Sequence, residues 1–316
     1  MADSSPNEAG EKRDGNGPSG IMTEEELKKV QKISLRMAEE FYAFCEFHHL
    51  TCYLCGGGCI GAVRNAGMIP WDDDLDFFMP RKDYETVLRL WKEERNNGRY
   101  FLENASRDMV THTLFFKIRD RETTCIYDEQ KDVNTVHGVA LDVLPLDGYP
   151  TRRIDRMKQV FWACIYSLFR AQVIPSRHGM AYAIGSRFLL SLVRGREMRY
   201  RIWRYAETQM TKYPMDACDG VTELCSGLKY MKNYYPKDIF GKALRVPFEN
   251  TFLPVPVGYD AYLRIAFGDY MKLPPENERV PHHDASYLDL ETPCASRVMF
   301  QDGKVCLVRK ESANGT

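Results

Sequence analysis

The sequence predicts a protein of the α/β or α+β class whose first half is built on a mixed sheet. Helical and strand patterns alternate from residue 23 to about residue 150, and one of the strands is acidic. The pattern then becomes helical beyond Pro150. A chain of 316 residues that is 44% hydrophobic also has enough apolar material for a sizeable core.

The first part of the chain carries clear helix and strand signals. Thr23 and Glu26 form a capping-box pattern, and Leu27, Val30 and Ile33 begin a helical repeat. Proline and glycine separate the segments that follow. The elements predicted here are, in order, a helix over 23–49, a strand over 51–55, a glycine turn over 56–58, a helix over 59–67, a strand over 74–80 and a helix over 81–98.

The later segments predict three strands, over 112–120, 122–129 and 139–148. Two helices follow, over 157–174 and 180–195. Neither helix is a clean apolar run of the about 20 residues that a membrane span needs. Core helices are the prediction, and peripheral contact with a membrane-bound acceptor is the alternative. The predicted organisation is a disordered tail (1–20), a catalytic core (21–150), a mainly helical region that completes the site (151–300) and a C-terminal tail (301–316).

Charge and cysteine content exclude several classes of protein. Lys and Arg number 43 against 44 Asp and Glu, so no general attraction to nucleic acid or to an anionic membrane is expected, and any anion recognition must be local. The first 20 residues lack the apolar stretch of a signal peptide, which predicts a cytoplasmic protein. A location at the inner face of the membrane is a variant of this prediction. Cys52, Cys55 and Cys59 raise the alternative of a zinc site. Because Cys52 and Cys55 would point to opposite faces of a strand, buried free thiols are predicted instead.

Four aspartates fall within five positions of the segment GMIPWDDDLD, namely Asp72, Asp73, Asp74 and Asp76. An isolated acidic run is more often a solvated loop. Here the apolar residues FFM follow, so the strand continues into a core. Asp74 and Asp76 share one face of that strand, and two adjacent carboxylates are unfavourable without a positive charge between them. The pattern therefore predicts a Mg²⁺ or Mn²⁺ site that also holds phosphate.

A glycine turn and the start of a helix precede the acids. Gly56, Gly57 and Gly58 allow backbone N–H groups to approach a phosphate closely, and a helix N-terminus offers further donors. Arg64 can add a bidentate phosphate contact. The glycines, the arginine and the acidic pair together predict a phosphate-binding site.

Two further polar residues occur within apolar strands. Asp142 interrupts GVALDVLPLDG, and an acid there is costly unless it is paired or metal-bound, so it is predicted to be a third metal ligand. Asp147 is predicted to shape a turn with Gly148. Lys117, in FFKIRD, is either a phosphate contact or a strand-end lysine in solvent.

Three segments resemble the LicD family. The stretch GGGCIGAVRNAGMIPWDDDLDFFMPRKDY is similar to the family's opening motif, GVALDVLPLDGYP to its second block, and AYLRIAFGDYMKLPPENERVPHH to its third. The resemblance spans about residues 27–283. It implies an α+β, nucleotidyltransferase-like fold and transfer of a phosphorylated alcohol from a CDP-linked donor. Members of this family move phosphocholine from CDP-choline onto cell-surface glycans, and relatives such as the fukutin-related protein move ribitol phosphate.

The resemblance also implies roles for individual residues. Asp74, Asp76 and Asp142 correspond to the family's metal-binding acids, and Gly56 and Gly57 to its phosphate-facing pair. Arg64 corresponds to the family's arginine. Three positions depart from the family pattern without removing a ligand: Gly58 replaces Thr or Ser, Asn65 a common His, and Phe267 a Tyr.

The predicted activity is metal-dependent transfer of a phospho-alcohol, foremost phosphocholine from CDP-choline, to a glycan or lipid-linked glycan hydroxyl. Asp142 would orient or deprotonate that hydroxyl. One alternative is a nucleotidyltransferase that moves the nucleoside monophosphate, and another is a non-catalytic nucleotide-binding module. His282 and His283 lie in a proline-bounded loop, where adjacent histidines are more often simply exposed, and their roles, like those of Asp72 and Asp73, stay open.

Overall fold

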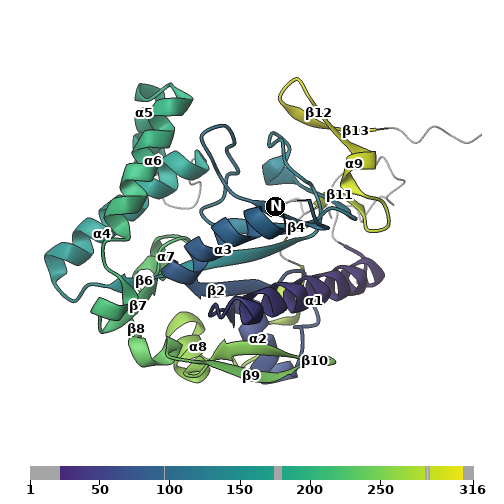
Figure 1. The fold of residues 1–316 in the computed structure, drawn as a ribbon, viewed down its shortest axis with the longest axis horizontal. Coiled ribbons are helices and arrows are strands. Elements are labelled where there is room, and N and C mark those ends of the chain that lie inside the picture. The colour runs from purple at the N-terminus through teal and green to yellow at the C-terminus, as the bar shows by residue number, and fades with distance from the viewer. Residues whose placement is uncertain (1–21, 96, 174–179, 282, 284, 309–316) are drawn as a thin grey trace, which may run out of the picture.

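The computed structural model describes residues 22–95, 97–173, 180–281, 283 and 285–308 (Figure 1). Its helices are α1 (Glu24–Phe47), α2 (Gly56–Asn65), α3 (Arg81–Glu94), α4 (Arg153–Ala171), α5 (Met180–Leu192), α6 (Arg196–Met210), α7 (Leu228–Met231), α8 (Tyr259–Phe267) and α9 (Cys294–Arg297). Its strands are β1 (Tyr53–Cys55), β2 (Asp76–Pro80), β3 (Tyr100–Glu103), β4 (Phe116–Asp120), β5 (Thr124–Tyr127), β6 (Ala140–Tyr149), β7 (Gly220–Glu223), β8 (Tyr235–Pro236), β9 (Ala243–Phe248), β10 (Thr251–Pro256), β11 (Ala285–Asp289), β12 (Val298–Gln301) and β13 (Lys304–Leu307).

A seven-stranded mixed sheet organises the fold. Its strands run in the order β1-β2-β6-β4-β3, and β7 pairs with the far half of β6 and then with β8. The β2–β6 pair is parallel, whereas the other pairs in this sheet are antiparallel. Helices flank this sheet, so the predicted α+β class with a mixed sheet is confirmed.

The two faces of the sheet differ in chemistry because side chains alternate along each strand. Phe77 on β2 and Phe116 on β4 are fully buried on one face, which α1 and α3 cover (Figure 1). The Phe41 ring of α1 lies 5.2 Å from the Phe77 ring, and the Tyr84 ring of α3 lies 4.7 Å from that of Phe116. The opposite face carries the polar residues of the same strands.

The N-terminal helix begins where the sequence predicts. Thr23 accepts a hydrogen bond from the Glu26 N–H, and the Glu26 side chain accepts one from the Thr23 N–H. This reciprocal pair satisfies two N–H groups that a helix start otherwise leaves without partners. The capping box is therefore confirmed.

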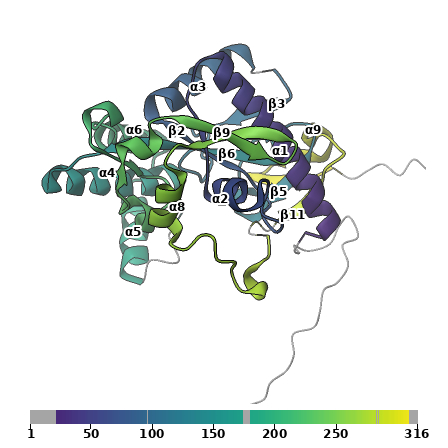
Figure 2. The ribbon, with the colours of Figure 1, turned by 90° about the horizontal axis from the view of Figure 1, so that it is seen from below.

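Segments beyond residue 211 contribute to the same core. The β9–β10 hairpin packs on β1, and α8 packs on α2, as Figure 2 shows from below. The hydroxyl of Tyr262 on α8 accepts a hydrogen bond from the Gly56 N–H of α2 at 3.0 Å. The mainly helical character predicted for 151–300 is found in 153–210 only, and strands predominate from Gly220 onward.

Helices α4, α5 and α6 form a separate group around Tyr166, Phe169 and Trp203. These are the predicted helices after Pro150. No helix in the described part of the chain combines the length and apolarity that crossing a membrane requires.

Three local predictions are wrong. Asp147 lies within β6 rather than in a turn, and its buried carboxylate receives Arg81 Nε at 2.9 Å and Nη2 at 2.7 Å. The residues predicted as a C-terminal tail partly pair as β12 and β13, while 309–316 and the predicted tail 1–20 lie outside the described residues. The glycines 56–58 form the first turn of α2 instead of a turn before it.

Candidate active site

A row of polar side chains crosses the sheet on the face opposite α1 and α3. Asp76 on β2 is the register partner of Asp142 on β6, and Asp142 is the register partner of Lys117 on β4. Register partners present their side chains on the same face. Lys117 Nζ lies 2.7 Å from Asp142 Oδ2, so this lysine is neither solvated nor free. The structure thus brings Asp76, Asp142 and Lys117 together from three strands.

The remaining acids lie in the segment that leads into β2. Asp74 precedes the strand, which begins at Asp76, and is partly exposed, whereas Asp72 and Asp73 are buried. Gln31 of α1 fixes this segment by donating from Nε2 to the Asp72 carbonyl at 2.8 Å and the Ile69 carbonyl at 3.1 Å. The backbone of the acidic segment is therefore held by a side chain that the sequence pattern does not single out.

His283 connects the C-terminal part of the chain to this segment. Its N–H and its Nδ1 each lie 3.1 Å from a carboxylate oxygen of Asp73, and Nδ1 lies 3.7 Å from Asp74 Oδ2. The hydrogen bond to Asp73 is the main reason why the pKa of His283 rises to about 9. His283 is thus a cation beside the acids rather than an unattached loop residue. His282 lies outside the described residues.

Crowding and burial disfavour ionisation of the acids. Burial, followed by the charges of Asp74 and Asp73, raises the pKa of Asp72 to about 8. Burial is also the first cause of the raised pKa of Asp76, and the charges of Asp74 and Asp142 add to it. The pKa of Asp74 is raised by burial as well, against the opposing charge of His283. Such a cluster stores unfavourable electrostatic energy that an added cation relieves.

The N-terminal turn of α2 lies against these acids. A Cβ on Gly57 would overlap the Asp72 carboxylate, and a Cβ on Gly56 would lie 3.6 Å from Asp76 Oδ2. Gly56 also has a positive φ of 52°, which favours glycine. Gly58 is different, because its Cβ would meet the apolar Leu75 side chain at 3.1 Å. The first two glycines thus give the acids room, and Gly58 faces the core.

Arg64 lies at the other end of α2 and does not reach the row across the sheet through any described hydrogen bond. Its Nη1 donates to the Tyr270 carbonyl at 3.1 Å, and its guanidinium lies 6.0 Å from the centre of the Trp71 ring. Arg279 lies over the same ring at 5.6 Å. Burial and the charge of Arg279 lower the pKa of Arg64. Among the described residues, neither guanidinium has a carboxylate within 4.0 Å.

A cavity of about 670 Å³ opens beside the polar row. Its lining includes Asp74, Asp142, Lys117 and His283, together with Tyr127. A space of this size accommodates a small organic ligand. Asp74 and Asp142 therefore meet solvent in the same hollow, although they come from different segments.

The residues present fit a hard divalent cation. Carboxylate oxygens are the ligands that Mg²⁺ and Mn²⁺ prefer, and a cation beside Asp74 and Asp76 would offset the burial and repulsion that raise their pKa values. Within the described residues, Asp73, Asp74 and His283 offer ligand atoms that all lie within 4.8 Å of one another. Asp142 directs Oδ2 to Lys117 instead. The predicted ligand set of Asp74, Asp76 and Asp142 stays a prediction.

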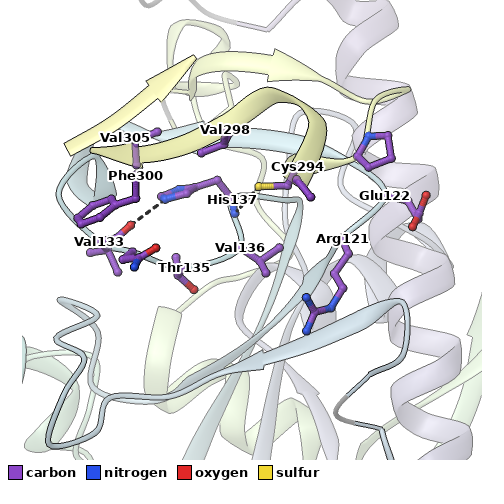
Figure 3. A pocket seen from close by; sticks show the side chains of 13 residues that line it. Arg121, Glu122, Val133, Thr135, Val136, His137, Cys294, Val298, Phe300 and Val305 are labelled. Atoms are coloured by element: carbon purple, nitrogen blue, oxygen red, sulfur yellow. Dashed lines mark hydrogen bonds between the residues drawn. The ribbon is translucent and has the colours of Figure 1, made fainter. Parts of the chain in front are cut away.

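A second cavity of about 320 Å³ lies elsewhere, between residues 133–137 and the C-terminal hairpin (Figure 3). His137 lines it, and the Nε2 atom of His137 hydrogen-bonds to the Val133 carbonyl at 2.9 Å. Cys294 lines it beside His137, and its Sγ accepts a hydrogen bond from the His137 N–H at 3.1 Å. None of the acids discussed above lines this cavity, so it is not part of the acid cluster.

The cysteines do not assemble around a common centre. Cys52, Cys55 and Cys59 are buried free thiols, and burial is the main cause that raises the pKa of each. A thiol with a raised pKa is a poor zinc ligand, since zinc binds the thiolate. The described geometry agrees with buried thiols as the role of these three residues.

Comparisons with known proteins test the resemblance to the LicD family. A model described as LicD/FKTN/FKRP, nucleotidyltransferase domain, matches residues 49–138, which contain Asp74 and Asp76 but not Asp142. The chain is also 29% identical over 271 residues to a protein of Haemophilus influenzae named lipopolysaccharide cholinephosphotransferase LicD. That match covers 81% of this chain and 96% of the relative. The predicted resemblance to the LicD family is confirmed, since residues 49–138 are similar to its nucleotidyltransferase domain and most of the chain is similar to one member.

Proposed function

We propose that this protein transfers phosphocholine from CDP-choline to a hydroxyl of a cell-surface glycan or its lipid-linked precursor, in a reaction that depends on Mg²⁺ or Mn²⁺. The observation that carries the proposal is that Asp74 and Asp142, from different segments, line one cavity, while Asp76 is the register partner of Asp142 on the neighbouring strand. The relative named as a cholinephosphotransferase supports the choice of phosphocholine.

Asp74 and Asp76 would hold the cation, which neutralises the diphosphate of the donor and the charge that builds on the leaving CMP. The N-terminal turn of α2 lies against Asp72 and Asp76, and the N–H groups of a helix start would stabilise a phosphate bound beside it. His283 contributes a second positive charge beside Asp73 and Asp74. The site therefore offers an environment for an anionic donor despite its many acids.

The acceptor hydroxyl would attack the phosphorus atom that carries choline. A new P–O bond forms there, the P–O bond to CMP breaks in line with it, and CMP leaves with the electron pair. Asp142 would accept the hydroxyl proton, since it lines the cavity and has the Lys117 ammonium as its charge partner. Lys117 in turn keeps Asp142 oriented and adds positive charge near the donor phosphates.

Arg64 and Arg279 would form an accessory anion site around Trp71. Two guanidiniums that share one aromatic ring, with no carboxylate within 4.0 Å among the described residues, favour an anionic ligand. The phosphate contact predicted for Arg64 would be made at this pair of arginines. Arg279 joins it from the loop after Pro274, whose carbonyl accepts its Nε–H at 2.9 Å.

Two labels distinguish this reaction from the alternatives. The protein is incubated with Mg²⁺, a glycan acceptor and CDP-choline labelled separately in choline and in cytidine. Choline label on the glycan, with cytidine label in CMP, is the expected result. Cytidine label on the acceptor would instead identify a nucleotidyltransferase. Binding of CDP-choline without any product, or release of free phosphocholine alone, contradicts the proposal.

A further inference from the structure

Helix α5 exposes a stripe of large apolar side chains. Ile184, Phe188 and Leu192 are 63%, 61% and 63% exposed, respectively. Their spacing of four residues places them on one face of the helix. We call these three residues the α5 stripe. An exposed apolar patch of this kind indicates an interaction site rather than a packing surface within the chain.

The other face of α5 is anchored to the molecule. Ser186 and Leu190 are buried, which is the spacing expected of the opposite face. Arg199 of α6 donates from Nη2 to the Leu190 carbonyl and from Nε to the Val193 carbonyl, each at 2.7 Å. These bonds satisfy carbonyls at the end of α5. The helix is therefore held with the α5 stripe directed away from α6, at the margin of the molecule (Figure 1).

The surroundings of the α5 stripe are strongly basic. Residues 180–196 contain three arginines and no acid, although the whole chain has a net charge of -1. Arg187 lies on α5 itself, and Arg194 and Arg196 follow it, all three exposed. The positive charge is thus concentrated where the apolar side chains are exposed.

We propose that α5 docks on an anionic lipid bilayer, with the α5 stripe inserted below the headgroups and the neighbouring arginines among the lipid phosphates. Apolar and basic residues combined on one exposed helix are the features of helices that lie in the membrane interface. A second copy of this chain fits less well, because a symmetric contact through α5 would bring Arg187, Arg194 and Arg196 close to their own equivalents. The proposal extends the function above by bringing the enzyme to the surface where a lipid-linked acceptor would reside.

Vesicle co-sedimentation tests this docking without donor or acceptor. The full chain is mixed with phosphatidylcholine vesicles that contain or lack phosphatidylglycerol. We expect binding to the anionic vesicles that falls with added salt. Changing Phe188→Ser together with Leu192→Ser should weaken it at least about tenfold. Arg187→Gln alone should weaken it about fivefold, since each basic residue near the surface contributes in that range.

Matched controls come from exposed residues elsewhere. Phe47→Ser removes a 78% exposed phenylalanine at the end of α1, and Arg89→Gln removes an exposed arginine of α3. Neither should change vesicle binding, and all variants should melt as the unchanged protein does. Equal binding of the double variant and Phe47→Ser overturns the proposal. So does a dimer in sedimentation velocity that the double variant alone abolishes, without vesicle binding. Because no transfer is measured, failure of the proposed function would leave this result unaffected.

Discussion

Single carboxylates in the acidic segment have distinct expected roles despite their similar chemistry. Changing Asp74→Asn should reduce transfer at least about a hundredfold, because a cation ligand in the cavity is lost. The metal-free variant should be as stable as the unchanged protein or more so, since one of the crowded like charges disappears. Transfer rate and thermal unfolding without metal are the two measurements.

The control for this variant is Asp128→Asn. Asp128 lines the same cavity, but it is exposed and pairs with Lys131 on the surface. Its loss should leave transfer within about twofold, because surface ion pairs contribute little. Full activity of Asp74→Asn would remove this residue from the catalytic assignment, whereas equal losses in both variants would indicate a general effect of negative charge.

Glu223 on β7 makes folding stability depend on pH. Burial raises its pKa from 4.5 to about 7, against the opposing hydrogen bonds from the Cys225 and Ser226 N–H groups. The folded protein therefore binds a proton between these pH values that the unfolded chain releases. Linkage then requires the contribution of Glu223 to stability to be complete below pH 4.5 and to be lost as the pH rises through about 7.

The variant Glu223→Gln should remove this dependence, because its amide stays neutral and can still accept both N–H groups. Urea unfolding on the two sides of the interval should show a smaller fall in stability for the variant than for the unchanged protein. An identical fall in both proteins would mean that Glu223 is ionised throughout.

Residue roles could be predicted from sequence only where the local pattern sets the chemistry. The acids 74 and 76 and the strand acid Asp142 stand out because their neighbours are apolar. Nothing local distinguishes Asp147 from a turn residue, since its buried partner Arg81 lies 66 positions away. The contact of His283 with Asp73 spans 210 positions and depends on the path of the whole C-terminal segment.

Helix α2 depends on glycine at its first turn. Gly57→Ala should lower both stability and transfer, because the added Cβ would displace the Asp72 carboxylate from its place beside the helix start. Gly185→Ala on α5 is the matched control, since no atom lies within 4 Å of its added Cβ, and it should stabilise the protein by about 0.5–1 kcal/mol. Thermal unfolding and transfer rates compare the two. Normal behaviour of Gly57→Ala would show that the acidic segment can shift without cost.

The positions of helices and strands were more predictable from the sequence than the pairing of the strands. Capping signals and apolar spacing located α1, α3, β4 and β6 closely, because these signals are local. The parallel pairing of β2 with β6 joins strands more than 60 positions apart, and β7 reaches the same sheet after three helices. Strand order of this kind is decided by burial of the whole sheet face, which no single segment encodes.

The molecule as a whole should respond to the ligands of the site. Mg²⁺ alone should raise the melting temperature, because a cation that binds only the folded chain relieves the crowding of the acids. CDP-choline added with Mg²⁺ should raise it further, and excess chelator should reverse both shifts. The Asp74→Asn variant should show a reduced shift with Mg²⁺. A melting temperature that ignores Mg²⁺ in the unchanged protein would contradict the cation site.

The pairing of Asp76 with Asp142 has a consequence for how this protein can vary. Backbone hydrogen bonds between β2 and β6 set the separation of the two acids. That separation therefore does not depend on the length of the 65 residues between them. Loops within that stretch, such as 104–113, can lengthen or shorten while the spacing of the acids stays fixed. The walls of the cavity are built partly from those loops, since Thr111 and His112 line it. Insertions and deletions in these loops can therefore change substrate choice between relatives without changing the distance between Asp76 and Asp142.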